Sequence, residues 1–298
     1  MTMTDPVTRD RRPPQRLRVS FTDGATSELV VFRAAEPDAP VVLCLPAMGV
    51  RASYYTAVAA ALAARGHTAV LADLRGNGGS SVRPSRSTTF GYAELLDIEL
   101  PQIVEALRRE LGAGRITLFG HSLGGHLSVL HAATSPHVAA TVLVATGTSW
   151  YGRVPGIRRP ARFLGLQIIR LATALHGYLP GWLPFAGVEA RGVVRDWMHD
   201  ATRGAYLVHG SPVDYEAALS RSTVPALFVV LPGDRYVPEA CSRQLADRLP
   251  SAGVSWAHVA PEQVGLARTH HFRWAHRPDA VVEAALRWLG SNNTEVTS

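Results

Sequence analysis

The sequence contains no lysine. Arginine supplies all 30 residues of the combined lysine and arginine count, and the formal net charge is +6. A GC-rich genome prefers arginine and alanine codons, and such a preference leads to a sequence with much arginine and little lysine. We favour this compositional origin of the charge over nucleic-acid binding, because no arginine stripe falls on a recognisable binding module. The sequence therefore predicts no nucleic-acid partner.

Cysteine is almost missing as well. Only Cys44 and Cys241 occur, in apolar or helical contexts. We expect free buried thiols rather than a disulfide, as suits a reducing cytoplasm. Neither cysteine has metal-ligand spacing, so the sequence predicts no metal site and no cofactor.

Long apolar runs are the third absence. No stretch reaches the length of a transmembrane helix, and residues 1–18 carry arginines and prolines without the apolar segment of a secretory signal. We expect residues 1–15 to be disordered, and the protein to be cytoplasmic without stable membrane insertion. The sequence sets no expectation for the oligomeric state.

What the chain does contain is an alternation of short apolar strands with helical patterns. The predicted strands cover residues 16–21, 27–32, 41–45, 68–73, 115–119, 139–145, 225–231 and 254–259. Such alternation is typical of a parallel sheet with helices on both faces, so we expect an α/β fold with a mostly parallel central sheet. We assign its core to residues 16–148 and 223–290, with a closing helix over 278–289 and a disordered tail over 291–298.

One predicted helix contains a proline. The helical pattern runs from about Tyr92 to Leu111, and Pro101 lies inside it. Because proline has no N–H to donate and its ring clashes with the preceding turn, we expect a kink or a split there.

The alternation stops between residues 149 and 222, where no strand is evident. Apolar side chains recur at helical spacing at Leu164, Ile168, Leu171, Leu175 and Leu179. We expect a helical lid over the sheet. Its aromatic side chains are candidates for substrate contact, namely Trp150, Tyr151, Trp182 and Trp197. The alternative is a basic amphipathic helix that lies on a membrane surface.

The sequence Gly120-His121-Ser122-Leu123-Gly124 stands at the centre of the chain. It fits G-x-S-x-G, the nucleophile elbow of the α/β-hydrolases. An apolar strand precedes it and a helix-compatible stretch, 126–134, follows, which is the context that the motif requires. The turn is so sharp that side chains at the flanking glycines would collide with neighbouring backbone. We therefore assign Ser122 as a nucleophile.

A serine hydroxyl needs a base, and the base needs a carboxylate that holds its tautomer. Asp234 follows a strand end and a glycine turn, which is where α/β-hydrolases carry the acid of the triad. The alternative is that Asp234 only stabilises the turn. The base should follow the last strand. There His270 and His271 occupy the loop, whereas His258 lies within the strand and His276 at the start of the final helix.

An oxyanion hole needs two preorganised N–H donors. One should be the N–H of Leu123, directly after the nucleophile. The other should come from the loop Pro46-Ala47-Met48-Gly49 after an early strand. We choose Met48 over Ala47 by its distance from the strand end.

Three motifs together resemble the α/β-hydrolase superfamily: the elbow with Gly125, residues 73–80 (Asp-Leu-Arg-Gly-Asn-Gly-Gly-Ser) and residues 234–238 (Asp-Arg-Tyr-Val-Pro). The second is typical of the esterase, lipase-like and serine-aminopeptidase-like branch. Residues 54–55, 195–197, 214–219 and 271–274 are similar to a group of bacterial predicted α/β-hydrolases whose substrates are mostly unassigned. In this family the base stands before a phenylalanine, which implies His271 rather than His270. Two departures are Pro46-Ala47 in place of His-Gly, and Arg273 in place of a small residue.

The resemblance implies a serine-dependent hydrolase with the triad Ser122, His271 and Asp234. We expect it to cleave an acyl ester or thioester of a small, partly apolar metabolite through an acyl-enzyme. Acyl transfer or acyl elimination by the same triad, in a biosynthetic pathway, is the alternative, because fold does not fix chemistry. A non-catalytic ligand binder is a third, less favoured interpretation, since such a protein has no need of all three residues.

Overall fold

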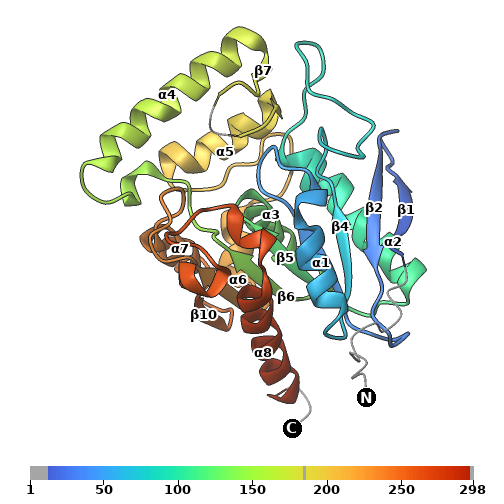
Figure 1. The fold of residues 1–298 in the computed structure, drawn as a ribbon. Helices are drawn as coiled ribbons and strands as arrows, with labels where there is room; N and C mark the ends of the chain where they lie inside the picture. Colours follow the sequence, from blue (N-terminus) through green and yellow to red (C-terminus); the bar gives the residue numbers. More distant parts are fainter. Residues whose placement is uncertain (1–12, 184–185, 296–298) are drawn as a thin grey trace, which may run out of the picture.

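A mixed sheet forms the centre of the protein (Figure 1). The computed structural model describes residues 13–183 and 186–295. Within them the sheet has eight strands: β1 (Gln15–Ser20), β2 (Thr26–Phe32), β3 (Val41–Leu45), β4 (Thr68–Ala72), β5 (Ile116–His121), β6 (Val138–Val144), β9 (Ala226–Val230) and β10 (Val254–His258). Their order is β1-β2-β4-β3-β5-β6-β9-β10. The β1–β2 and β2–β4 pairs are antiparallel and the rest are parallel. The expected α/β fold with a mostly parallel sheet is thus confirmed.

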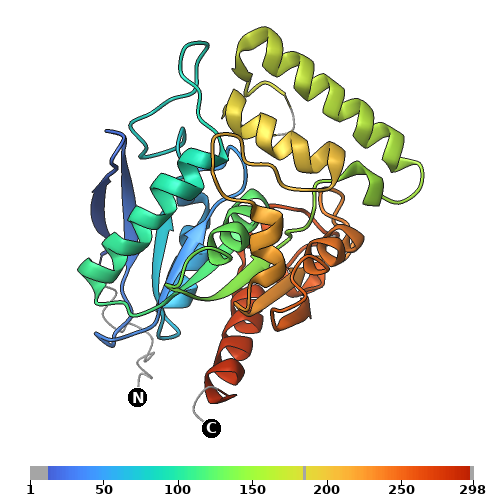
Figure 2. The same ribbon diagram turned by 180° about the vertical axis from the view of Figure 1, so that it is seen from behind.

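Helices cover both faces of the sheet. On one face lie α1 (Thr56–Ala63) and α8 (Asp279–Glu295). The opposite face, seen in Figure 2, carries α2 (Leu100–Leu111), α3 (Leu123–Ala132) and α6 (Tyr215–Arg221). Every residue of β3, β4, β5 and β9 is buried, which explains why these strands are continuous apolar runs. The remaining short elements are α7 (Glu239–Ala246) and 3-10 turns at Ala52–Tyr55, Tyr151–Arg153, Pro261–Val264 and Arg273–His276.

Pro101 does not split its helix. A π-helical segment, Glu94–Glu99, runs directly into α2, and Pro101 is the second residue of α2. Because the chain is already helical before Pro101, the proline cannot donate to a carbonyl of the preceding turn, and that turn has to make room for its ring. The wider turn of the π-segment supplies the transition. The expected kink or split is therefore replaced by a change of helix type.

The insertion after β6 lies above the carboxyl ends of the strands (Figures 1 and 2). Its helices are α4 (Arg158–His176) and α5 (Arg191–Arg203). Contrary to expectation it contains strand pairing, between β7 (Tyr178–Leu179) and β8 (Glu189–Ala190). Helix α6 also fell within the expected lid range, 149–222, but it packs beside α3 in the layer that covers the sheet. The part above the sheet therefore ends before α6.

Helix α4 is apolar on two sides. Leu166, Ile169 and Ala172 are buried. The series identified from sequence points the other way: the exposed fractions are 62% for Leu164, 50% for Ile168, 61% for Leu171 and 63% for Leu175. Leu179 belongs to β7 and is buried. The outer face of the insertion is thus an aliphatic stripe in contact with water.

The chain ends differ in part from expectation. Strand β1 begins at Gln15, inside the range expected to be disordered, and residues 1–12 lie outside the described part. Helix α8 continues to Glu295, through most of the expected disordered tail. A helix already anchored by packing extends readily, because each further residue adds one backbone hydrogen bond.

Within the described ranges no helix is long and apolar enough to cross a membrane. Cys44 and Cys241 are free and buried, as expected.

Candidate active site

The sharp turn at Ser122 is built by its neighbours. Strand β5 extends to His121 and α3 begins at Leu123, so the turn is tighter than the sequence indicated. Ser122 has φ 53° and ψ −114°, a left-handed conformation that costs a non-glycine residue free energy. A Cβ at Gly120 would lie 2.4 Å from the carbonyl oxygen of Gly124, and one at Gly124 would lie 2.1 Å from that of Leu45. Both glycines of the motif are thus sterically required.

Asp234 and His271 form a buried pair. The Nδ1 atom of His271 lies 2.6 Å from Oδ2 of Asp234, and their side chains are 2% and 1% exposed. The other carboxylate oxygen accepts the N–H groups of Tyr236 at 2.8 Å and Val237 at 3.4 Å. Because every oxygen of this carboxylate is engaged, its orientation is fixed. Asp234 reaches this place because the turn after β9 brings it to the carboxyl edge of the sheet.

The His271 ring is held on two sides. Tyr236 stacks on it with ring centroids 5.0 Å apart and planes inclined by 29°. The ring of His121 lies at 4.7 Å, and Phe272 meets His271 edge-on at 4.7 Å. His270, in contrast, is exposed. The structure therefore brings His271, and not its neighbour, to the aspartate.

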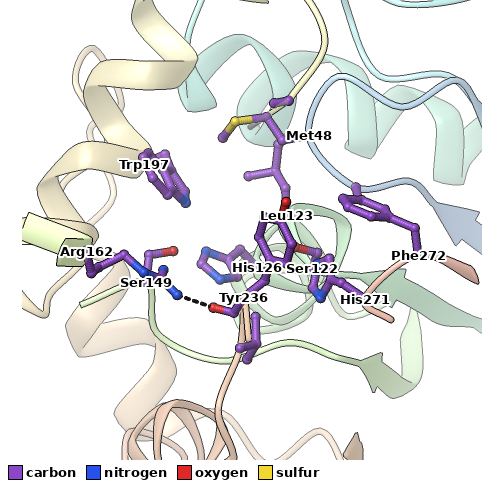
Figure 3. Close-up of a pocket in the computed structure, with 13 residues that line it drawn as sticks. Met48, Ser122, Leu123, His126, Ser149, Arg162, Trp197, Tyr236, His271 and Phe272 are labelled. Atoms are coloured by element: carbon purple, nitrogen blue, oxygen red, sulfur yellow. Dashed lines mark hydrogen bonds between the residues drawn. The ribbon is translucent and has the colours of Figure 1, made fainter. Parts of the chain in front are cut away.

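A small cavity of about 50 Å³ opens between these groups (Figure 3). Ser122 and His271 both line it, together with Met48 and Leu123. The lining also includes Ala47, His126, Ser149, Arg162, Ala186, Trp197, Tyr236, Val237 and Phe272. Small-molecule sites commonly measure a few hundred Å³, so this cavity by itself is smaller than a typical ligand site.

Both residues expected to supply oxyanion donors, Met48 and Leu123, line this cavity. Leu123 is the first residue of α3, so its N–H has no carbonyl one turn earlier to bond. The N–H of Ala47 donates to the hydroxyl of Tyr55 at 3.2 Å. Ala47 is therefore engaged within the protein, which favours Met48 as the second donor.

Two histidines beside the elbow are buried. Nδ1 of His121 lies 2.6 Å from the Tyr55 hydroxyl, and burial lowers the pKa of His121 well below its usual value, helped by the nearby His271. Nε2 of His126 lies 2.7 Å from the carbonyl oxygen of Gly147, and burial lowers the pKa of His126 too. His126 also reaches the cavity wall, whereas His121 does not.

The four aromatic side chains proposed from sequence to contact substrate lie in different places. Trp197 of α5 lines the cavity. The other three are elsewhere: Trp182 is 67% exposed, Trp150 covers Gly204, and Tyr151 contacts Phe163. None of these three lines the cavity beside Ser122, because they stand in the turns around α4 and β7 and not on a segment that faces the serine. Arg273 is exposed and does not line the cavity.

Several lining residues were not identified from sequence, above all Arg162 and Tyr236. Tyr236 lies two residues after Asp234, and this short spacing was the available signal. Arg162 had none, because five arginines occur between residues 149 and 188 without any distinguishing motif. No group of three or more metal-ligating side chains gathers in the part of the chain described here.

This fold, with a serine on a strained strand–helix turn and a buried His–Asp pair beside it, defines a class of α/β enzymes. Comparison by sequence agrees: residues 42–284 match the pattern of the Alpha/beta hydrolase family. The chain belongs to that family.

Individual relatives are distant. Putative carbamate hydrolase RutD of Cronobacter sakazakii is 25% identical over 241 residues, which are 75% of this chain and 84% of that protein. Est1E from Butyrivibrio proteoclasticus, solved with ferulic acid bound, has a TM-score of 0.63 at 15% identity and covers 92% of this chain and 98% of its own. The thioesterase domain from the curacin biosynthetic pathway has a TM-score of 0.57 at 17% identity, covering 92% and 100%. At these identities the solved structures show a common fold.

Proposed function

We propose that the protein is a serine-dependent hydrolase that cleaves an acyl ester or thioester of a small, partly apolar metabolite. The observation that carries the proposal is the buried His271–Asp234 pair, with Nδ1 and Oδ2 2.6 Å apart, at the cavity that Ser122 also lines. The esterase and thioesterase folds among the structural neighbours support this class of substrate.

In the proposed mechanism Ser122 Oγ attacks the acyl carbonyl while Nε2 of His271 takes its proton. Asp234 holds the opposite ring nitrogen protonated and stabilises the imidazolium. The negative charge on the carbonyl oxygen is accepted by the N–H groups of Leu123 and Met48. His271 then returns the proton to the leaving oxygen or sulfur, and an acyl-enzyme remains. Water, activated by the same imidazole, attacks this ester and frees Ser122.

The site walls indicate the kind of acyl group. A second cavity of about 260 Å³ adjoins the first and shares Arg162, Trp197 and Tyr236 with it. Leu166 and Ile169 make its wall apolar. An acyl chain or ring of modest size fits these surroundings.

A fluorophosphonate probe tests the nucleophile directly. It should label the protein once, and Ser122→Ala should abolish the label. A panel of acyl esters and thioesters should then give free acid in a Ser122-dependent manner. Labelling that survives Ser122→Ala would contradict the proposal. The same reactions with added alcohols or amines would reveal acyl transfer, if the product is an acylated acceptor instead of the acid.

A further inference from the structure

Arg162 projects from α4 toward the cavity without an acidic partner. Its Nη2 donates to the carbonyl oxygens of Tyr236 at 2.5 Å and Arg235 at 3.3 Å (Figure 3). Among the described residues no carboxylate lies within ion-pair distance of it. A guanidinium has five N–H donors in a planar fork, so most of its donor capacity remains for a ligand.

The surroundings of Arg162 make this cation unusual. It is partly shielded from water, and burial lowers its pKa, against the opposing charge of Asp234. Asp234 itself is occupied by His271 and by the N–H groups of Tyr236 and Val237. Taking a cation partly out of water costs free energy, and because Asp234 already has other partners, an arriving anion would recover part of that cost.

Arg162 lies where the acyl part of a substrate must extend. It lines both the cavity beside Ser122 and the larger apolar cavity next to it. Figure 3 shows it across the site from His271. The leaving group has to lie on the side of His271, which protonates it, so the acyl part points the opposite way, toward α4.

We propose that Arg162 selects acyl substrates that carry a carboxylate on the acyl part, and that this carboxylate binds the N–H groups of Nε and Nη1, which the bonds of Nη2 to Tyr236 and Arg235 leave available. The inference rests on the proposed function, because it places the substrate relative to Ser122 and His271. Charge-assisted hydrogen bonds from these N–H groups would bind a carboxylate, and a guanidinium keeps its charge where burial would neutralise an ammonium, so arginine suits this task better than lysine. The metabolite is then a half-ester or half-thioester of a dicarboxylic acid.

Matched esters test the proposal. The p-nitrophenyl butyrate and hemisuccinate esters differ by a terminal methyl in place of a carboxylate. We expect kcat/KM of the native enzyme to favour the hemisuccinate about 10- to 100-fold, as for a charge-assisted hydrogen bond. Arg162→Met should bring this ratio close to one, and Arg162→Lys should keep part of it. Arg170→Met, on the same helix but lining a different cavity, should keep the native ratio.

A binding measurement removes the dependence on turnover. The hemisuccinate should bind to Ser122→Ala about tenfold more tightly than the butyrate in calorimetry, and the additional exchange Arg162→Met should abolish the difference. Equal binding, or Ser122-dependent hydrolysis of both esters with equal kcat/KM, would overturn this inference and leave the proposed function intact. A preference that persists in Arg162→Met would place the anion elsewhere. Failure of the fluorophosphonate to label Ser122 would instead reject the proposed function. A preference for 4-carboxyphenyl butyrate would move the anion to the leaving group and also reject the inference.

Discussion

The hydroxyl of Tyr55 lies 2.6 Å from Nδ1 of His121, and the same oxygen accepts the N–H of Ala47 at 3.2 Å. The hydroxyl joins the two groups whichever tautomer the His121 ring adopts. One buried phenol thus ties the loop after β3, where Met48 lies, to the end of the nucleophile strand. Burial raises the pKa of Tyr55 and lowers that of His121, so both groups are neutral over the physiological range.

Tyr55→Phe should therefore lower kcat by about tenfold or more with little change in KM. The variant leaves the N–H of Ala47 and Nδ1 of His121 buried without a partner, which costs about 1–3 kcal/mol of stability. Steady-state kinetics and urea unfolding measure the two effects. Tyr54→Phe is the matched control, because Tyr54 is adjacent and its hydroxyl makes no hydrogen bond within the described residues. A Tyr55→Phe enzyme with native kcat would show that the loop needs no such tie.

Ser122→Ala should reduce turnover by several orders of magnitude, because triad members act as a unit. The exchange keeps the Cβ and the backbone geometry, so the free energy of unfolding should stay within about 0.5 kcal/mol of the native value. Activity assays and thermal unfolding on the same preparation separate the two. Turnover within tenfold of the native enzyme would remove Ser122 from the mechanism.

Alanine variants of the neighbouring residues His270 and His271 can be compared with each other. His271→Ala should fall as far as Ser122→Ala under saturating substrate, because His271 contacts Asp234 and lines the cavity. His270→Ala should keep at least about a tenth of the native rate, since His270 is exposed. The reverse pattern would make His270 the base, and equal loss in both variants would mean that the loop no longer folds.

Glu189 should make stability depend on pH. Burial raises its pKa from 4.5 to about 7, against the opposing N–H groups of Ala190 and Gly49. A carboxyl whose folded pKa is the higher one stabilises the fold at low pH, and this contribution is lost as the pH rises from about 4.5 through about 7. The difference in unfolding free energy between the native protein and Glu189→Gln should therefore fall by roughly 3 kcal/mol between pH 4.5 and 8.

Urea unfolding across this pH range measures that difference. Glu262→Gln is the control, because Glu262 is exposed, and its difference from the native protein should not change with pH. A constant difference for Glu189→Gln would mean that this carboxyl titrates normally in the folded protein. Glu99 has a raised pKa of about 7 for the same reason, so the comparison has to be with the variant at each pH and not with the native curve alone.

The features that were predictable from sequence are those that local patterns encode. Ser122 stands in a motif whose glycines are sterically necessary, and the buried strands β3 and β9 are unbroken apolar runs. Asp234 could be placed because a turn follows a strand there, but the choice of His271 over His270 needed the family resemblance. Helix α4 shows what sequence patterns cannot predict. Both of its faces are apolar, so periodicity predicts a helix but cannot say which stripe is buried. The position of Arg162 depends on that rotation, and for this reason the sequence did not reveal it.

The two apolar sides of α4 also set how firmly this helix is held beside the site. Arg162 of α4 lines the cavity of about 50 Å³ next to Ser122, so a displacement of α4 would widen that cavity. The outer leucines stay in water in either position of α4. Only the inner side chains, chiefly Leu166 and Ile169, therefore contribute to the free-energy difference between the two positions. Their burial is worth about 3–6 kcal/mol together, and such a contribution shrinks on cooling. The population with α4 displaced should therefore grow as the temperature falls, whereas the chemical step slows on cooling.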